Sequence, residues 1–455
     1  MSHRDYTFFL FTLGCKINQY ETQAIREAWL QFGWQEMENP EQAGIIVINS
    51  CAVTARAVQD IRKMTRRFYR QNPLAKILIV GCAARPFAGE LSSLPGVSAV
   101  VPQESKSALL DQTQVKNCLI LGDTDQDKVF VPDKESLGNF CISSYPRARP
   151  VLKVEDGCSR FCTYCIVPYT RGQPKSRSGK SIWQEVQRLV TAGFQEIIVS
   201  GINLAQFSFD GKGDFWDLIY WLNRELERHF GQLARLRLSS LDPFLMHDKA
   251  LSVLDQSGLV CPHIHISLQS ASAGVLRRMG RAHTSRQGLE NFLAKLSSIW
   301  PDFGFGVDLL TGFPGETEEE FQETLSFCRQ MPLTYGHVFT FSPRPGTKAA
   351  QMDGRVPKAV KKDRSLALRQ VLAKKKMRFL NELSQKGHLE IIVEQEQPCL
   401  GLCQYYTLCW LEDEQFFEPK GSKILTKPLY YQDKGLVVQK ASKANKPLKP
   451  CQQAI

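Results

Sequence analysis

The sequence lacks long hydrophobic runs and a complete export signal. None of its apolar stretches approaches the ~18 residues that a membrane-spanning helix needs, so we expect no membrane association. The apolar stretch that ends at Cys15 is similar to the signal peptide of a lipoprotein, but it is short, and Asp5 spoils the positively charged lead-in that such a peptide requires. We therefore predict a cytoplasmic protein.

Cysteine is also scarce. The chain holds 14 cysteines among 455 residues, which is too few for a scaffold held together by disulfides. In a reducing compartment, cysteines that lie close together in the sequence more often bind a metal or take part in chemistry. The grouping of the cysteines is therefore more informative than their number.

The remaining composition is ordinary for a globular protein. Apolar residues make up 43% of the chain and charged residues 23%, and this length leaves room for two or three domains with a substantial core. The formal net charge is +11. Such an excess of cations favours a polyanionic partner, although a solvated basic surface would produce the same excess.

The most informative cysteines are Cys158, Cys162 and Cys165, which have C-x3-C-x2-C spacing and follow a strand-like run at Val151–Val154. A loop with this spacing can turn three thiolates toward one iron–sulfur cluster, and three ligands leave the fourth iron of a four-iron cluster open. A zinc site would need a fourth cysteine or histidine just downstream, where none follows at the usual spacing. A disulfide framework does not fit a chain without other secretory features.

The residues around these cysteines carry a family resemblance. The spacing, with Tyr164 directly before the last cysteine, resembles that of radical S-adenosylmethionine (SAM) enzymes. The longer string C-T-Y-C-I-V-P-Y-T-R-G, followed by Ser176 and Arg177, resembles one branch of that superfamily, the methylthiotransferases. The resemblance implies that the three cysteines bind a [4Fe-4S] cluster whose open iron binds SAM.

The first 140 residues alternate between strand-like and helical sequence. The strand-like runs are Thr7–Leu13, Gly44–Ile48 and Lys76–Val80, and helical sequence follows at Tyr20–Phe32 and Thr54–Arg70. This βαβα pattern predicts a parallel sheet, in which all strands end at the same edge.

Each of these runs leads to a cysteine. Because parallel strands end at one edge, we expect Cys15, Cys51 and Cys82 to converge there on a second cluster. The resemblance agrees, because methylthiotransferases carry an auxiliary [4Fe-4S] cluster on three such cysteines. Cys118 and Cys141 show no comparable pattern and are predicted to be structural.

Residues 146–350 contain six strand-like runs separated by helical or loop sequence. They are Val151–Glu155, Glu196–Gly201, Arg235–Ser240, His263–Gln269, Phe303–Gly312 and Tyr335–Ser342. Such alternation predicts a parallel sheet that curls into all or part of a barrel, with functional sites at the carboxyl ends of the strands. The resemblance sharpens this to the partial (β/α)6 barrel of radical SAM enzymes.

Several strings at the ends of these runs resemble segments that surround SAM in related enzymes. They are S-G-I-N at 200–203, L-Q-S at 268–270, G-F-P-G-E-T at 312–317 and S-P-R-P-G-T at 342–347. The resemblance implies that a set of residues binds the cofactor: Tyr164, Gly201, Asn203, Gln269, Asp308 and Gly312. Pro174, Ser200 and Ala271 depart from the family pattern, but none of them is a predicted iron ligand.

Residues 355–383 are predicted to form a basic helix. Its cations are Lys358, Lys361, Lys362, Arg364, Arg369, Lys374, Lys375, Lys376 and Arg378. The helix could be a solvated element packed on the barrel, or its cations could contact a nucleic-acid backbone, where lysine and arginine give affinity without reading sequence. A second basic face, on the helix after Cys51, carries Arg62, Lys63, Arg66, Arg67 and Arg70.

Short β-rich runs return between residues 387 and 441. They include Leu389–Val393, Tyr405–Leu411 and Leu436–Val438. These runs suffice for a small all-β barrel, whose position resembles that of the TRAM domain of methylthiotransferases, a domain associated with RNA binding. The strand-like sequence around Cys399, Cys403 and Cys409 offers no fourth metal ligand, so we predict that these are ordinary residues of this domain.

Together these observations predict an α/β protein. Residues 1–140 are expected to form an N-terminal parallel α/β domain, residues 141–383 a radical SAM partial (β/α)6 barrel with its basic helix, and residues 384–445 a small TRAM-like β-barrel. Residues 446–455 have the composition of a disordered basic tail.

The resemblance also implies a reaction. One electron cleaves SAM, the 5′-deoxyadenosyl radical takes a hydrogen atom from the substrate, and sulfur from the auxiliary cluster is delivered after methylation by a second SAM. An electron donor of the flavodoxin or ferredoxin type and a source of sulfur are then needed as partners. The basic charge and the TRAM-like domain favour RNA over a protein as the substrate, although all branches of the family share that domain.

The residues after the first two N-terminal cysteines bear on the substrate. The strings L-G-C-K-I-N-Q-Y-E-T and C-A-V-T resemble the branch that acts on N6-threonylcarbamoyladenosine beside the tRNA anticodon. Branches that act on isopentenyladenosine in tRNA or on a ribosomal protein are alternatives. An alternative of another class is a non-catalytic iron–sulfur protein that binds RNA or transfers electrons. An open iron inside a barrel favours the enzyme, because an electron carrier needs neither.

Overall fold

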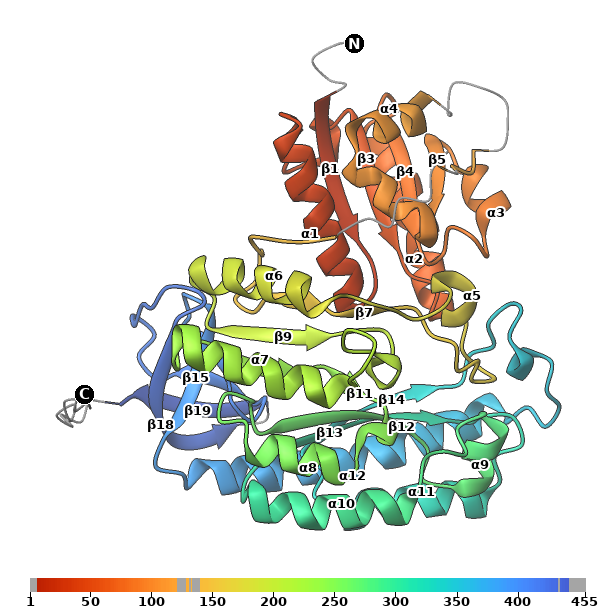
Figure 1. Cartoon of the computed structure of the whole chain (residues 1–455). Helices are drawn as coiled ribbons and strands as arrows, with labels where there is room; N and C mark the ends of the chain where they lie inside the picture. The colour runs from red at the N-terminus through yellow and green to blue at the C-terminus, as the bar shows by residue number, and fades with distance from the viewer. Residues whose placement is uncertain (1–5, 121–127, 131, 133–139, 433, 442–455) are drawn as a thin grey trace.

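The computed structural model describes residues 6–120, 128–130, 132, 140–432 and 434–441. Three larger groups of strands follow one another along these residues: a five-stranded sheet, a curved set of parallel strands, and a small closed barrel (Figure 1). The predicted tail at 446–455 lies outside the described residues. In the part of the chain that is described, no helix combines the length and apolar character needed to cross a membrane.

The N-terminal sheet is parallel throughout, with strand order β2-β1-β3-β4-β5. Ile45 and Val47 pack on the face covered by α1, and Ile46 and Ile48 on the face covered by α2, as side-chain alternation along a strand requires. The strands are β1 (Thr7–Thr12), β2 (Gln35–Glu36), β3 (Ile45–Ser50), β4 (Lys76–Gly81) and β5 (Val97–Pro102). The helices are α1 (Lys16–Gln31), α2 (Ala55–Gln71), α3 (Ala88–Ser92) and α4 (Gln112–Ile120). The predicted parallel α/β arrangement is confirmed.

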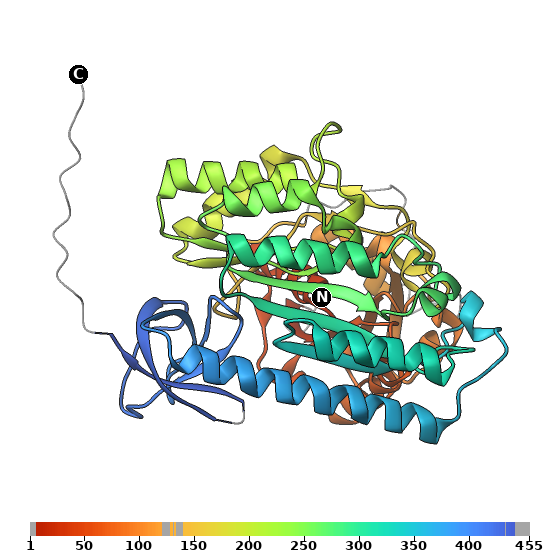
Figure 2. The same cartoon turned by 90° about the horizontal axis from the view of Figure 1, so that it is seen from below.

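The central region forms an open, curved arrangement of parallel strands in two hydrogen-bonded sheets, β10-β9-β6 and β11-β12-β13-β14. Seen from below, its helices cover the outer side of the curve (Figure 2). The strands are β6 (Val151–Lys153), β9 (Glu196–Ser200), β10 (Arg235–Leu238), β11 (Ser240–Leu241), β12 (His263–Gln269), β13 (Gly304–Thr311) and β14 (Tyr335–Thr340). The longer helices are α6 (Gly179–Thr191), α7 (Phe215–Phe230), α8 (Asp248–Asp255), α10 (Arg286–Ile299), α11 (Glu318–Gln330) and α12 (Lys358–Ser384).

The third predicted strand of this region is divided. Residues 235–240 form β10 and β11, which belong to different sheets. β10 pairs with β9, whereas β11 pairs with β12. The break at Ser239 is therefore where the curved arrangement splits into its two sheets.

The C-terminal strands close into a small barrel with the order β15-β16-β17-β19-β18. Cys399, Cys403 and Cys409 lie in its apolar core together with leucine, isoleucine and valine side chains. The strands are β15 (Leu389–Gln395), β16 (Leu400–Cys403), β17 (Leu408–Leu411), β18 (Lys423–Gln432) and β19 (Gly435–Lys440). A closed barrel leaves no strand edge unpaired, so this small unit buries its backbone polar groups within itself.

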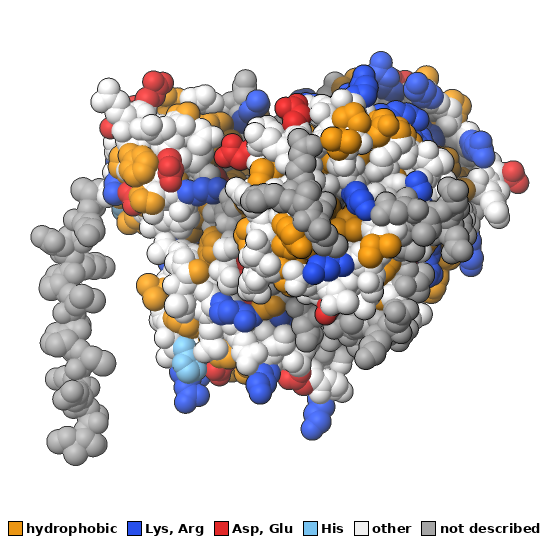
Figure 3. Space-filling model, turned by 90° about the horizontal axis from the view of Figure 1, so that it is seen from above, with side chains coloured by type: hydrophobic (Ala, Val, Ile, Leu, Met, Phe, Trp, Pro, Cys, Tyr) orange, Lys and Arg blue, Asp and Glu red, His pale blue; other side chains and the backbone are white. Residues whose placement is uncertain are grey.

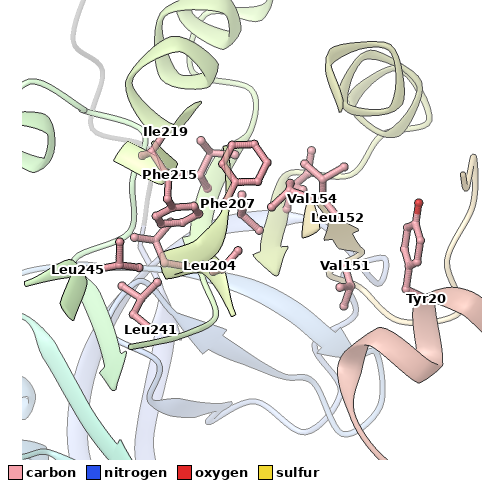
Figure 4. Close-up of a cluster of buried hydrophobic side chains, with 14 of the residues drawn as sticks. Tyr20, Val151, Leu152, Val154, Leu204, Phe207, Phe215, Ile219, Leu241 and Leu245 are labelled. Carbon is pink, nitrogen blue, oxygen red and sulfur yellow. The ribbon is translucent and has the colours of Figure 1, made fainter. Parts of the chain in front are cut away.

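One hydrophobic core joins the N-terminal sheet to the curved strands. Tyr20 of α1 belongs to the same buried cluster as Val151 and Leu152 of β6 (Figure 4). The hydroxyl of Tyr20 donates to the carbonyl oxygen of Phe140 at 2.7 Å. The two regions therefore pack on each other directly, which fixes the edge of the N-terminal sheet over the central strands.

The C-terminal barrel closes the opposite end of the central strands. Arg237 of β10 donates to Cys403 O at 3.0 Å and to Gln404 O at 3.1 Å. His263, the first residue of β12, lies with its ring centroid 4.7 Å from that of Tyr406. The amino-terminal ends of these strands are thus covered by the C-terminal barrel.

Cations gather on parts of the surface. Figure 3 looks down on the N-terminal end, where lysine and arginine side chains collect toward one edge. Along α2, Lys63, Arg66, Arg67 and Arg70 are exposed, whereas Arg62 forms an ion pair with Glu90. The predicted second basic face is therefore largely solvent-accessible.

Candidate functional site

The loop that carries Cys158, Cys162 and Cys165 lies between β7 (Glu155–Asp156) and α5 (Val167–Arg171). The N–H of Cys158 donates to Gly172 O and that of Cys165 to Cys162 O, both at 2.9 Å. Phe161 takes a left-handed conformation, with φ of 48°, which turns the chain between the first two cysteines. The loop is therefore held at both ends while it folds back on itself.

The three thiols of this loop lie close enough to affect one another. Burial raises the pKa of Cys165 to about 12, and the neighbouring Cys162 and Cys158 act in the same direction. Burial also raises the pKa of Cys162, although Arg281 opposes this. Such thiols keep their protons until a metal displaces them.

Several N–H groups point at the sulfur atoms. Asn203 Nδ2 lies 3.3 Å from Cys158 Sγ, and the N–H of Arg160 lies 3.5 Å from the same atom. Arg281 Nη1 is 3.9 Å from Cys162 Sγ. Donors around cysteine sulfurs stabilise negative charge on thiolates that bind an iron–sulfur cluster. The surroundings of the loop therefore fit such a cluster.

The N-terminal sheet brings a second set of three cysteines to one edge. Thr12 pairs with Asn49, and Ser50 pairs with Gly81, so β1, β3 and β4 end at the same level. The residues that follow these ends include Cys15, Cys51 and Cys82.

Close approach within this second set depends on a glycine. A Cβ atom at Gly14, whose φ is 110°, would lie 2.8 Å from the Cβ of Cys51, so a side chain there would push the two segments apart. Burial raises the pKa of Cys51 to about 11, and the nearby Cys82 and Cys15 add to this effect. Cys15 itself is exposed, which leaves one side of the set open to a ligand.

Both sets offer cysteine thiols as candidate metal ligands. Within the described residues, no three His, Cys, Asp or Glu side chains meet as they would around one metal ion. A four-iron cluster binds each thiolate through a different iron, so its ligands lie farther apart than those of a zinc ion. The all-cysteine donor sets and the N–H groups aimed at sulfur fit clusters of this kind.

Arg171 connects the two sets of cysteines. It ends α5, just after the Cys158 loop, and donates to Asn18 Oδ1 on α1 at 2.7 Å and to Asp156 Oδ1 at 2.7 Å. Burial lowers the pKa of Arg171, but the nearby Asp156, Cys82, Glu21 and Cys15 outweigh this and raise it well above its usual value. The guanidinium group therefore lies near the N-terminal set of cysteines, while its own helix directly follows the Cys158 loop.

The acidic partner of Arg171 on α1 is completely buried. Glu21 accepts from Arg171 Nη1 at 3.1 Å, from Lys106 Nζ at 2.6 Å and from Lys153 Nζ at 3.1 Å. Burial favours the protonated form, but these three cations hold the pKa of Glu21 well below its ordinary value. This network ties α1, which begins directly after Cys15, to β6 and α5, which flank the other loop.

Two residues predicted to bind SAM lie beside the Cys158 loop. The N–H groups of Ile202 and Asn203 both donate to Glu155 Oε2 at 2.8 Å. Gly201 has no room for a side chain, because a Cβ atom would lie 2.8 Å from the same oxygen. Burial raises the pKa of Glu155 to about 8. Its Oε1 atom is buried without a partner among the described residues, so one polar atom remains for a ligand.

Three other predicted residues lie at strand ends or in the loop. Gln269 ends β12 in a left-handed conformation with φ of 68°, which costs energy for any residue other than glycine. Tyr164 packs edge-on against Phe313, with ring centroids 6.4 Å apart. Gly312 follows β13, and a Cβ atom there would lie 2.4 Å from Lys361 Cγ. Gly312 therefore also makes room for α12.

Asp308 belongs to a polar chain between neighbouring strands. Its Oδ1 atom lies 3.1 Å from His265 Nε2. The other ring nitrogen of His265 is 2.9 Å from the hydroxyl of Tyr335, which is also 2.8 Å from His263 Nε2. A strand surface lined by such groups suits a polar ligand more than an apolar one.

Sequence reasoning missed the buried charge network and the polar chain. Lys153 stood inside an apolar strand-like run, and Glu21 stood on the helix that follows Cys15. A charged residue in an otherwise buried strand requires a partner. The lysine in this apolar run could therefore have predicted a buried ion pair. The identity of the partners depends on packing between regions far apart in the sequence.

Two family models match the chain. A model described as "Uncharacterized protein family UPF0004" matches residues 7–102, and one described as "Radical SAM superfamily" matches residues 152–328. The first covers the strands that lead to Cys15, Cys51 and Cys82, and the second covers the Cys158 loop and most of the curved strands.

Curated relatives match most of the chain. A threonylcarbamoyladenosine tRNA methylthiotransferase of Bacillus subtilis is 36% identical over 86% of this chain and 85% of its own length. Its namesake from Aquifex aeolicus is 32% identical over 85% and 92%. A tRNA-2-methylthio-N(6)-dimethylallyladenosine synthase of Geobacillus thermodenitrificans is 32% identical over 86% and 74%. Relatives with two different substrate names therefore match at similar identity.

A solved structure shares the fold. The radical SAM methyltransferase TsrM of Kitasatospora setae, solved with cobalamin and a [4Fe-4S] cluster, gives a TM-score of 0.58 over 76% of this chain and 77% of that one. The two sequences are 13% identical, so this likeness supports the fold alone.

Proposed function

Because the chain belongs to the family of radical SAM tRNA methylthiotransferases, we propose that it transfers a methylthio group to C2 of N6-threonylcarbamoyladenosine beside the anticodon of tRNA. The observation that carries this proposal is the pairing of two three-cysteine sites through Arg171. A reaction that needs both a radical and a sulfur atom requires two such sites next to one substrate.

The first site comprises Cys158, Cys162 and Cys165, which we propose as ligands of a [4Fe-4S] cluster. The donors from Asn203 and Arg281 favour its thiolate form. The proposed SAM pocket adjoins it and comprises Tyr164, Gly201, Asn203, Gln269, Asp308 and Gly312. The unpartnered oxygen of Glu155 supports a ligand with a polar group at this place.

The second site comprises Cys15, Cys51 and Cys82, which we propose as ligands of an auxiliary [4Fe-4S] cluster. When bound, the two clusters and SAM supply the radical that removes hydrogen and the sulfur, methylated by a second SAM, that replaces it. The chain's own residues fix the distance between the sites: Glu21 and Arg171 join α1 to the loop after Cys165. They hold both sites against a substrate placed between them.

The substrate branch rests on Lys16. A threonylcarbamoyl group ends in a carboxylate, whereas a dimethylallyl group is an uncharged hydrocarbon. Lys16 follows Cys15, and partial burial, followed by the charges of Arg149 and Arg237, lowers its pKa. No carboxylate of the described residues forms an ion pair with it within the 4.0 Å limit. A free cation beside the auxiliary site supports an anionic substrate group.

The proposal includes the wider organisation of the protein. We propose three domains, at 1–140, 141–383 and 384–445, the last being a TRAM-like domain that contacts RNA. An electron donor of the flavodoxin or ferredoxin type and a sulfur source would complete the catalytic cycle. The place of action would be the cytoplasm, where tRNA is modified.

Mass spectrometry of tRNA nucleosides tests this function. Cells that lack the gene should lose 2-methylthio-N6-threonylcarbamoyladenosine, and the intact gene should restore it, whereas genes with Cys158→Ala or Cys15→Ala should not. If the methylthiolated isopentenyl nucleoside is lost instead, the substrate is isopentenyladenosine in tRNA. If neither nucleoside changes, tRNA is not the substrate.

Iron analysis tests the two clusters separately. The anaerobically reconstituted protein should bind about eight iron ions per chain, and replacing either cysteine set by alanine should lower this to about four. A wild-type protein that binds only about four would show that the second set holds no cluster.

A further inference from the structure

A cavity of about 780 Å³ lies between the first turns of α12 and the ends of β13 and β14. Phe341, Pro343 and Leu366 give it apolar surface. Five cations surround it: Arg355, Lys358, Lys361, Lys362 and Arg369. No acidic side chain is among the described residues that line it. We call this cavity with its five cations the α12 groove.

The positive charge of the α12 groove is not cancelled by the protein. None of its five cations has a carboxylate partner within 4.0 Å among the described residues. Arg364, on the same helix, behaves differently: it is buried and pairs with Glu316 at 2.9 Å and Glu318 at 3.1 Å. The helix therefore uses one arginine to anchor itself and leaves the others available.

Backbone carbonyl groups hold some of these cations in place. Arg369 Nη2 donates to Val338 O at 3.0 Å, and Lys361 Nζ to Phe341 O at 3.4 Å. Burial lowers the pKa of Lys361, and the nearby charge of Arg355 lowers it further. Carbonyl groups orient a cation without neutralising it, so a bound anion would relieve the repulsion among these side chains.

The position of the groove relates it to the proposed reaction site. Gly312 and Ser342, which line it, follow the carboxyl ends of β13 and β14, where sites of this architecture lie. A second hollow of about 440 Å³ continues along α12, lined by Arg329, Lys374, Lys375 and Arg378. The helix then reaches the C-terminal barrel, where Lys376 Nζ donates to Lys434 O at 2.9 Å (Figure 2).

We propose that the α12 groove binds phosphodiester groups of the tRNA substrate and directs the strand along α12 toward the C-terminal barrel. From Lys358 to Arg369 the helix rises about 17 Å, which is several times the spacing of about 3.4 Å between phosphates along the axis of one strand in duplex DNA. A line of cations of this length fits a chain of several phosphates better than one small anion. The inference rests on the proposed function, because it assumes that RNA is the substrate.

Binding of a tRNA anticodon stem-loop transcript tests the groove. Three exposed cations are replaced together, in Lys358→Gln, Lys362→Gln and Arg369→Gln. The matched control replaces three exposed cations on α6, α7 and the loop between β9 and α7, which lie away from α12 (Figure 2): Lys180→Gln, Lys212→Gln and Arg228→Gln. Affinity is measured at several salt concentrations on reconstituted full-length protein, and the melting temperature and iron content show that each variant is folded.

We expect the groove variant to bind the transcript about tenfold more weakly, and the slope of log affinity against log salt to fall by about 2 to 3. The control should keep the wild-type affinity and slope.

A groove variant with wild-type affinity and slope overturns the proposal while the function stands. If the wild-type protein binds no RNA, the proposed function and this inference both fail. If RNA binding is unchanged but electron transfer from an acidic flavodoxin slows, the groove serves that partner instead.

Discussion

Arg171 is a single side chain that contacts both halves of the candidate site. It is 1% exposed, and its partners Glu21 and Asp156 belong to α1 and β7. Replacing it with methionine should lower the free energy of unfolding by about 3–5 kcal/mol, because the buried Glu21 and the partly buried Asp156 lose a cation. Urea denaturation measures this loss. Arg378→Met, at a site 78% exposed, is the control and should change stability little; equal losses would contradict a special role for Arg171.

Lys16 should decide which modified adenosine is accepted. If it binds the threonyl carboxylate, Lys16→Gln removes a charged hydrogen bond worth about 1.5–3 kcal/mol, which corresponds to a kcat/KM about 10- to 100-fold lower. Methylthiolation of tRNA that carries threonylcarbamoyladenosine measures the effect, with iron content as a check on the clusters. Lys180→Gln should leave the rate unchanged. Unaltered kcat/KM in Lys16→Gln would remove the basis for the substrate branch.

Glu155 should make stability depend on pH. The carboxyl group loses its proton near pH 4.5 in the unfolded chain, whereas burial raises the pKa in the folded protein to about 8. Between these values the unfolded state is ionised first, so the free energy of unfolding falls as pH rises, by at most about 1.4 kcal/mol per pH unit. The contribution is constant below pH 4.5 and above pH 8.

Replacing Glu155 by glutamine should remove this dependence. The amide oxygen can still accept from the N–H groups of Ile202 and Asn203, but it carries no charge. Urea denaturation of the wild type and Glu155→Gln between pH 5.5 and 8 should show the variant gaining stability relative to the wild type as pH rises. Parallel profiles would mean that Glu155 does not titrate in this range.

At the scale of elements, α12 depends on a glycine in the loop after β13. Gly312 and Gly346 both have positive φ, 73° and 75°, but only Gly312 is crowded, because its Cβ would lie 2.4 Å from Lys361 Cγ. Alanine should cost about 1–3 kcal/mol at either site through backbone strain and more at Gly312 through the clash. Thermal unfolding of both variants measures the difference. The double variant Gly312→Ala/Lys361→Ala should regain the part of the stability loss that comes from the clash. If alanine lowers stability equally at Gly312 and Gly346, α12 shifts to relieve the clash.

Many elements could be predicted because their sequence signals are local. β12 has the predicted bounds, His263–Gln269. β1 and β14 begin at the predicted residues and end at Thr12 and Thr340, slightly before the predicted ends. Buried strands read as apolar runs, and these runs end where a turn or a cysteine begins. The division of residues 235–240 into β10 and β11 could not be predicted, because it reflects pairing with different neighbours.

Only the part of the site that depends on local sequence and strand order could be predicted. Strand-end cysteines are visible in sequence, and a parallel sheet places them at one edge. The contact between Arg171 and Glu21 joins residues 150 positions apart, and nothing local specifies it. The α12 groove likewise arises from packing of α12 against the ends of β13 and β14. The positions of cysteines at strand ends were predictable, whereas networks between elements were not.

At the scale of the molecule, the C-terminal barrel is expected to belong to the same cooperative unit as the central strands. Arg149 pairs with both Glu196 of β9 and Glu394 of β15, and Arg235 pairs with both Glu196 and Glu390. Their shared partner Glu196 is completely buried, and the cations hold its pKa below the usual value against the effect of burial. Removing the barrel would expose this ionic cluster and the start of the central strands.

Deleting residues 385–455 should therefore lower the melting temperature sharply or leave the chain insoluble, because Arg237 would lose its bonds to Cys403 O and Gln404 O and the ends of the central strands would face water. Differential scanning calorimetry of the full chain should then show one transition for the central strands and the barrel together. Deleting only residues 446–455, the predicted tail, is the control and should leave the melting temperature unchanged. A shortened chain that melts like the full one would establish the barrel as an independent unit, tethered to the enzyme only by α12.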